Sequence, residues 1–328
     1  RVITGSARTI DGKLHIGDTD GKVTVVDPKD VESSEPSKLS IMPENLLKDL
    51  SEADRRDLFT YLLTPPPTMP RDLAEGRPRP RPRGEVLALL AGAPERPAKL
   101  RRVNIVLVAG PKDHGPGEHD YPAWQKAWTE LIASAEEVDV STAWEWPSKE
   151  QFAKADVLVF FQRGTWNPDR AADLDPFLAR GGGALFIHWA VEGNPNAEEF
   201  AQRIGLACKQ IKYRHGPLDV EFNRAISHPV ARNFTRLQMV DESYWEMTGQ
   251  LADDRVIATS REDGASQPIF WSLEHGKGRV FVSIPGHYSW SFDDPAFRIL
   301  LLRGIAWCAK EPVDRFNDLV WPGAEFAR

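Results

Sequence analysis

Between residues 101 and 312 the chain alternates short apolar runs with segments of helical periodicity. Residues 103–109 and 156–161 are largely apolar, which is typical of strands buried on both faces of a parallel sheet. Between them, Pro122 opens a helix whose apolar side chains share one face. Further strands are expected at 184–188, near Val256 and Ile269, and at 280–284, with helices at 169–180 and 295–308. This alternation predicts a doubly wound α/β sheet, in which ligands bind at the carboxyl ends of the strands.

The first hundred residues follow another pattern. Residues 1–63 contain two hairpin signals, Asp11-Gly12 and Asp20-Gly21, followed by a helix with Ser51 as its N-cap. Residues 64–100 hold nine prolines, which is typical of a semi-rigid linker. We therefore predict four parts: a small β-plus-helix segment at 1–63, a Pro/Arg-rich linker at 64–100, an α/β domain at 101–312 and a tail at 313–328.

Composition excludes several classes of protein. The net charge of -7 argues against a general nucleic-acid binder, because phosphate binding needs a basic surface. No apolar run approaches the roughly 18 residues of a membrane-spanning helix, so no membrane span is expected. The two cysteines, Cys208 and Cys308, are too few for a disulfide scaffold or a cysteine-rich zinc site.

The glycine-rich loop after residue 109 carries no nucleotide motif. It lacks both the Gly-Lys-Ser/Thr of a P-loop and the GxGxxG that opens a dinucleotide-binding helix. It instead carries His114, Glu118, His119 and Asp120 at the carboxyl end of a strand. Two interpretations stay open here: a substrate or metal loop, and a solvated polar loop.

Residues 181–193 read as strand, sharp turn and helix, the arrangement of a nucleophile elbow. The elbow position holds His188 rather than serine or cysteine, so acyl transfer through a covalent intermediate is not expected. A histidine there serves as an acid or base, as a metal ligand, or as a buried structural residue. Glu192 either belongs to the same site or faces solvent.

Two further clusters place polar side chains beside aromatic ones. Asp241 and Glu242 precede Tyr244, a composition typical of sugar sites and also of packing clusters. His287 follows the strand expected at 280–284 and lies near Trp290 in the sequence. Because parallel strand ends converge on one crevice, the topology permits His188 and His287 to meet.

These residues together resemble the ThuA-like (trehalose utilisation) family. The matching motifs, spread over residues 101–312, are Gly182-Gly183, Phe186-Ile187-His188, His215-Gly216-Pro217, His228-Pro229, Asp241-Glu242-Ser243-Tyr244, residues 276–281, Gly286-His287 and Gly304-Ile305-Ala306-Trp307. The resemblance implies a flavodoxin-like, class I glutamine-amidotransferase-like fold with helices on both faces of a mostly parallel sheet. It also implies the breakdown of disaccharides, including 3-keto derivatives. The loop with His114 and His119, and the tail at 313–323, resemble a planctomycete-type subgroup.

In amidotransferases of this fold the elbow bears a catalytic cysteine. Here His188 takes that place and His287 stands where the partner histidine is expected, so glutaminase activity is not expected.

Residues 1–63 resemble the end of a c-type cytochrome-like haem-binding region. The resemblance rests on residues 40–44, 46–47 and 57–62, in which Met42 corresponds to an axial ligand. The chain lacks Cys-x-x-Cys-His, so no haem is expected in it. Because the chain begins at Arg1, we expect a fragment or a processed form, and the resemblance implies an upstream cytochrome-like region in the full-length protein. Such a protein would be exported, for example to the periplasm.

The sequence therefore favours a carbohydrate-processing enzyme, a hydrolase or lyase that acts on a glycoside or 3-keto-sugar. The alternatives are a non-catalytic sugar-binding module and an interaction domain of an electron-transfer protein. The expected catalytic residues are His188, His287, Glu242 and, as second carboxylate, Asp241. A divalent metal such as zinc, bound by His119, His188 and His287, is an alternative to acid–base chemistry alone. The expected substrate-binding residues are His114, Asp120, Trp166, Trp189, Glu192, His215, Tyr244 and Trp290.

Overall fold

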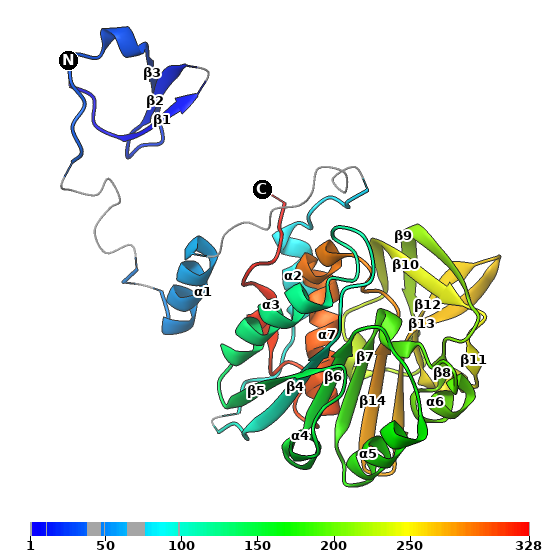
Figure 1. The fold of residues 1–328 in the computed structure, drawn as a ribbon. Helices are drawn as coiled ribbons and strands as arrows, with labels where there is room; N and C mark the ends of the chain where they lie inside the picture. The colour runs from blue at the N-terminus through cyan, green and yellow to red at the C-terminus, as the bar shows by residue number, and fades with distance from the viewer. Residues whose placement is uncertain are drawn as a thin grey trace. The chain divides into compact units, whose positions relative to one another are not determined.

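The chain divides into two units, Arg1–Leu63 and Thr64–Arg328, and Figure 1 shows its elements. The computed structural model describes residues 2–10, 12–37, 47–48, 50–63, 76–97 and 99–327. The segment around Met42, predicted to resemble a haem-ligand region, lies outside the described residues. Among the described residues, no helix combines the length and the apolar character needed to cross a bilayer.

The first unit contains a three-stranded antiparallel sheet and one helix. Its elements are β1 (Ser6–Ile10), β2 (Lys13–Gly17), β3 (Val23–Val26), the short η1 (Pro28–Asp30) and α1 (Glu52–Leu63). The predicted cap of α1 is present: the Ser51 hydroxyl accepts from the Asp54 amide, and the Ser51 amide donates to the Asp54 carboxylate.

The second unit is built on a nine-stranded sheet in the order β10-β9-β12-β13-β14-β7-β6-β4-β5. Five neighbouring strands are parallel: β14 (Gly278–Ser283), β7 (Gly183–Ile187), β6 (Val157–Phe161), β4 (Val103–Ala109) and β5 (Val138–Trp144). The antiparallel strands β13 (Ala265–His275), β12 (Val256–Glu262), β9 (Lys212–Phe222) and β10 (Arg236–Trp245) extend the sheet beyond β14 (Figure 1). The predicted α/β fold is confirmed, and the antiparallel half is an extension of it.

The difference between the two halves follows from their sequences. Every residue of β6 is buried, as expected for a strand covered on both faces. Exposed and buried positions alternate along much of β9, as expected for an antiparallel strand with one face open to solvent. A short antiparallel pair, β8 (Leu206–Ala207) with β11 (Thr248–Gly249), lies apart from the main sheet.

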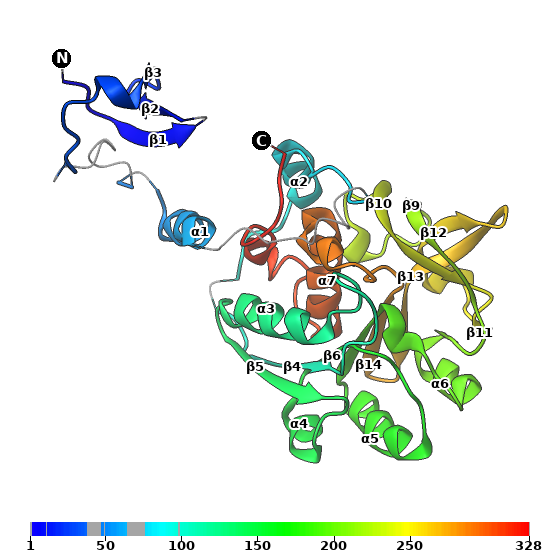
Figure 2. The same cartoon turned by 45° about the horizontal axis from the view of Figure 1, so that its top comes forward.

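Helices cover both faces of the parallel half. In Figure 2, α3 (Tyr121–Ala133) and α7 (Pro295–Cys308) lie on one side of it, and α4 (Lys149–Lys154), α5 (Pro168–Ala179) and α6 (Ala197–Ile204) lie on the other. Short 3-10 segments connect these elements: η3 (His188–Val191), η4 (Pro229–Ala231), η5 (Asp253–Arg255), η6 (Ser289–Asp293) and η7 (Asn317–Val320).

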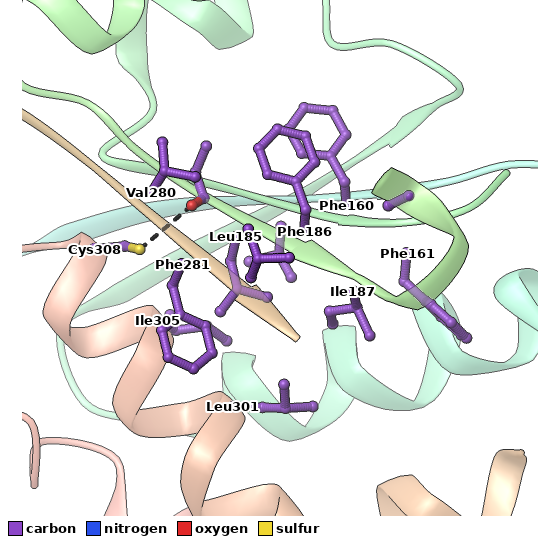
Figure 3. Packing of buried hydrophobic residues seen from close by; sticks show 14 of the residues in the cluster. Phe160, Phe161, Leu185, Phe186, Ile187, Val280, Phe281, Leu301, Ile305 and Cys308 are labelled. Atoms are coloured by element: carbon purple, nitrogen blue, oxygen red, sulfur yellow. Dashed lines mark hydrogen bonds between the residues drawn. The ribbon is translucent and has the colours of Figure 1, made fainter. Parts of the chain in front are cut away.

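The core lies between the parallel strands and these helices. On one face, Phe160 of β6 and Phe186 of β7 stack with ring centroids 4.8 Å apart. On the other, Phe281 of β14 packs close to Gly304 of α7. Figure 3 labels Phe160, Phe186 and Phe281, together with Cys308, whose thiol donates to the Ala184 carbonyl. Every residue of α7 is buried, so this helix is covered on all sides by the rest of the unit.

Part of the segment predicted as a linker packs on the α/β unit. It forms α2 (Arg83–Leu90), and Val86 of this helix is fully buried. The Arg83 guanidinium lies 4.4 Å from the Trp321 ring centroid, and Arg81 bonds to Asp294, the N-cap of α7. These contacts hold residues 81–90 and the C-terminal residues on the same layer of the unit as α7.

Gly183 provides a test of this packing. A Cβ on Gly183 would lie 2.3 Å from the Cys308 carbonyl oxygen, so β7 and the end of α7 must separate in Gly183→Ala. We expect the free energy of unfolding to fall by about 2–3 kcal/mol, as is usual for overpacking. The matched control is Gly84→Ala, because nothing lies within 4 Å of a Cβ at Gly84. Chemical denaturation measures both variants, and equal losses would contradict the packing described.

Candidate metal centre

His188 stands at the carboxyl end of β7 in a strained conformation. Its φ is 55°, in the left-handed region that only a few non-glycine residues occupy. The ring is fully buried, and its Nδ1 donates to the Ile284 carbonyl at 2.7 Å. Because a carbonyl can only accept, Nδ1 carries the hydrogen and Nε2 of the neutral ring presents a lone pair.

His119 faces His188 from the loop between β4 and α3. Its Nδ1 lies 2.9 Å from Asp113 Oδ1 and 2.8 Å from the Tyr121 hydroxyl. The carboxylate again places the hydrogen on Nδ1, so Nε2 presents a lone pair. The two Nε2 atoms are 2.8 Å apart. Two lone pairs at this distance repel each other unless a proton or a metal cation lies between them.

Three more side chains converge on His188 Nε2. Glu242 Oε2 lies 3.2 Å away, His287 Nδ1 3.2 Å and the Tyr244 hydroxyl 2.8 Å. His287 Nδ1 is also 3.0 Å from Glu242 Oε2, to which Tyr244 donates at 3.0 Å. His287 follows β14, whereas Glu242 and Tyr244 belong to β10. The parallel and antiparallel halves of the sheet therefore meet at this cluster.

Burial and the neighbouring charges shift the pKa values of the cluster in different directions. Burial, together with the neighbouring His188 and His287, lowers the pKa of His119 to about 3, although Asp113 opposes this shift. Burial acts to raise the pKa of Glu242, but the neighbouring His188 and His287 rings outweigh it, and the pKa is lowered. Burial acts to lower the pKa of His287, but Glu242 outweighs it, and that pKa is raised. Burial raises the pKa of Tyr244, which therefore keeps its proton.

The donor set fits a divalent metal ion. The ligand atoms of His119, His188, Glu242 and His287 lie within 4.8 Å of one another, and all four side chains are buried. An ion with four bonds of 2.0–2.1 Å in tetrahedral geometry separates its ligand atoms by about 3.3 Å. Imidazole and carboxylate are ligands that suit zinc and related metals. The Asp113 carboxylate accepts a hydrogen bond from Nδ1 of His119, the interaction that commonly orients a metal-binding histidine.

Asp241, predicted as a second catalytic carboxylate, fixes the backbone beside the cluster. Its fully buried carboxylate accepts hydrogen bonds from the amides of Glu242, Gly286 and His287 and from the Ser291 hydroxyl. The side chain thus ties β10 to the loop that carries His287. With both oxygens engaged in this way, Asp241 positions the neighbouring ligands.

Half-exposed residues form the solvent side of the cluster. His215 Nε2 lies 3.3 Å from Glu242 Oε1, and its Nδ1 lies 3.0 Å from the Tyr288 hydroxyl. His114 is bonded to Asp113, with its ring centroid 3.7 Å from that of His119. Both predicted substrate-binding histidines therefore lie where a ligand would approach.

The three tryptophans predicted to stack on a sugar occupy different environments. Trp166 is 1% exposed and stacks on Phe200, which leaves it no open face for a sugar. Trp290 is also buried, and its Nε1 donates to the Val240 carbonyl. Trp189 is half-buried, with its ring 5.4 Å from that of Tyr244. Burial thus removes Trp166 and Trp290 as stacking surfaces and leaves Trp189.

Two other predicted substrate-binding residues have structural partners. Asp120 caps α3 by accepting from the Ala123 amide. Glu192 is buried and paired with Arg163, whose Nε lies 2.9 Å from its carboxylate. The sequence reasoning missed Asp113 and Tyr121. One indication of both residues was present in the sequence: they lie within a few positions of His119, and a loop can fold back on itself over that distance.

The fold and the cluster together define an α/β protein with a buried histidine–carboxylate centre at the carboxyl ends of its parallel strands. A scan against protein families matches the ThuA family, described as trehalose utilisation, over residues 106–308. That match spans more than half of the chain. The chain therefore belongs to the ThuA family, and this membership suggests a carbohydrate-related role.

Solved structures show the same fold. A ThuA-like protein from Parabacteroides merdae is 17% identical, with a TM-score of 0.53, over 64% of this chain and 90% of its own. A ThuA-like protein from Bacteroides uniformis is 18% identical, with a TM-score of 0.52, over 66% of this chain and 95% of its own. The search of curated proteins found no match. The planctomycete-type and cytochrome-like resemblances stay predictions.

The role of Asp241 can be tested with Asp241→Asn. The amide oxygen can take the place of Oδ1 and keep its three backbone donors, but the NH2 group then takes the place of Oδ2 and leaves the Ser291 hydroxyl without an acceptor. We expect the free energy of unfolding to fall by about 1–3 kcal/mol, as when a buried donor loses its acceptor. Denaturation of the variant and of the exposed control Asp253→Asn measures the effect. A loss no larger than that of the control would contradict the positioning role.

Proposed function

We propose that this protein is a carbohydrate-processing enzyme, a hydrolase or lyase that acts on a glycoside or 3-keto-sugar at a metal-assisted site. The observation that carries this proposal is the 2.8 Å approach of two imidazole lone pairs, those of His119 and His188, beside an ionised carboxylate. The substrate class is supported by membership of the family described as trehalose utilisation. The cluster offers both metal ligands and proton-transfer groups.

His119, His188, His287 and Glu242 Oε2 would hold the ion, for which zinc is the favoured identity. When bound, such an ion supplies Lewis acidity and lowers the pKa of a bound water molecule. Asp113 keeps the His119 ring in the tautomer that leaves Nε2 available as a ligand. Tyr244 holds Glu242 Oε2 in place through its hydroxyl.

The second oxygen of Glu242 gives the site its proton-transfer group. Glu242 Oε1 points toward the half-exposed His215, 3.3 Å away, and thus toward the side from which a ligand approaches. The lowered pKa keeps the carboxylate ionised, so Oε1 can accept a hydrogen bond from a hydroxyl group or water and orient that proton toward His215. His215 Nε2 lies within reach to pass that proton on or return it.

Replacement of the central ligand tests the proposal. We expect His188→Ala to lose bound metal and at least 100-fold in turnover, in line with the usual contribution of positioned catalytic groups. Turnover is measured by product analysis with trehalose and 3-keto-trehalose, and metal content by elemental analysis. The matched control is His275→Ala, since His275 on β13 bonds to the Arg203 carbonyl.

Unchanged turnover in His188→Ala would contradict the proposal. Binding of either sugar by the wild type without any product would instead favour the sugar-binding module.

Metal removal is an independent test. Dialysis against a chelator is expected to abolish turnover, and added zinc is expected to restore it. Removal also leaves the lone pairs of His119 and His188 facing each other, so we expect the melting temperature to fall. Full activity after complete metal removal would show that acid–base chemistry alone suffices.

A further inference from the structure

One nitrogen of His287 has no role in the cluster described so far. Its Nδ1 faces Glu242 and His188. Its Nε2 has no hydrogen-bond partner among the described residues, although the side chain is only 1% exposed. When Nδ1 serves as a ligand, Nε2 must carry the hydrogen. A buried donor without an acceptor is costly, so this atom points to a partner that binds from outside.

The nearest carboxylate to this donor is Glu118. Its Oε1 lies 3.7 Å from His287 Nε2, beyond the 2.7–3.2 Å of a hydrogen bond. The side chain of Glu118 is 26% exposed, so solvent reaches it. The donor and the carboxylate thus face each other across a gap.

The backbone on both sides of this gap is fixed. Glu118 pairs with Tyr288 in a short antiparallel bridge. The His119 amide donates to the His287 carbonyl at 3.0 Å, and the Ser289 amide donates to the Gly117 carbonyl at 2.8 Å. These bonds join the loop after β4 to the loop after β14, so the separation of Glu118 and His287 is built into the fold.

We propose that the gap between Glu118 Oε1 and His287 Nε2 is the subsite for one hydroxyl group of the sugar. This inference rests on the proposed function, which supplies the ligand class and the role of His287 Nδ1. The hydroxyl oxygen accepts from the His287 N–H, and its hydrogen is donated to the Glu118 carboxylate. Because the two atoms are 3.7 Å apart, a hydroxyl oxygen within hydrogen-bond distance of both lies beside the line that joins them.

Other ligand groups match the gap less well. A keto oxygen accepts from His287 but has no hydrogen to donate to Glu118. A carboxylate or phosphate is repelled by the negative charge of Glu118. The subsite therefore selects a hydroxyl group over a keto or anionic group, and the 3-keto carbon of an oxidised sugar must lie elsewhere in the site.

Some of the rings around His287 are partly exposed to solvent. His114 and His215, whose side chains are 42% and 43% exposed, flank the His287 ring with centroids 5.6 and 4.7 Å away. The Tyr288 ring, with its centroid 4.5 Å from that of His287, stacks on Trp290. A sugar that binds over these half-exposed rings would approach the gap from the side of Glu118, whose side chain solvent reaches.

Glu118→Gln and Glu118→Ala test the assignment. The probes are trehalose, 3-keto-trehalose and the monodeoxy analogues of trehalose, with dissociation constants from calorimetry. We expect each variant to bind the sugars about 10- to 100-fold more weakly, the usual range for a lost hydrogen bond to a charged group. Zinc content and melting temperature should not change. The control is Glu130→Gln, because Glu130 is an exposed residue of α3.

The deoxy analogues identify the hydroxyl group. The wild type should bind one of them about 10- to 100-fold more weakly than trehalose, and this difference should be smaller in Glu118→Ala, where only the His287 N–H still binds the hydroxyl group. If the wild type binds none of the sugars, both the proposed function and the subsite are wrong. If it binds them and the Glu118 variants bind equally well, the subsite alone is wrong. Loss of zinc from the variants would also overturn it, because Glu118 would then act by positioning His287.

Discussion

The facing lone pairs of His119 and His188 are the constraint on which the arrangement of this site depends. Each imidazole has its hydrogen fixed on Nδ1 by an acceptor, Asp113 for one ring and the Ile284 carbonyl for the other. The two Nε2 atoms are therefore 2.8 Å apart, and neither carries a hydrogen that it could donate to the other. A positive charge between them removes the repulsion, and the ionised Glu242 beside them stabilises that charge. The arrangement of the cluster therefore supports the proposal of a bound cation.

The fold creates this constraint by joining two kinds of sheet. The parallel half places His188 at the end of β7 and His287 after β14, while the loop after β4 supplies His119. The antiparallel half supplies Glu242 from β10. Asp241, the neighbour of Glu242, bonds to the backbone of the His287 loop and fixes the two halves at this point. The cluster therefore needs both halves of the sheet, because the parallel half supplies the three histidines and the antiparallel half supplies Glu242.

The sequence predicts the parallel half well, because fully apolar runs such as residues 157–161 are specific to strands covered on both faces. Strand order then makes the proximity of His188 and His287 foreseeable, and their nearest ring nitrogens are 3.2 Å apart. The partners of His119 were harder to foresee, because they depend on a loop conformation with φ of 43° at that residue. The burial of Trp166 was not predictable either, since tryptophan is as typical of a core as of a sugar-stacking surface.

X-ray absorption spectroscopy of the purified protein tests the central claim most directly. The account predicts a stoichiometric divalent metal with nitrogen and oxygen ligands at about 2.0–2.2 Å, together with the outer-shell scattering of three imidazole rings. Nitrogen NMR of the histidine side chains would detect the alternative. Protein free of metal, with one proton shared between the Nε2 atoms of His119 and His188, would contradict the account.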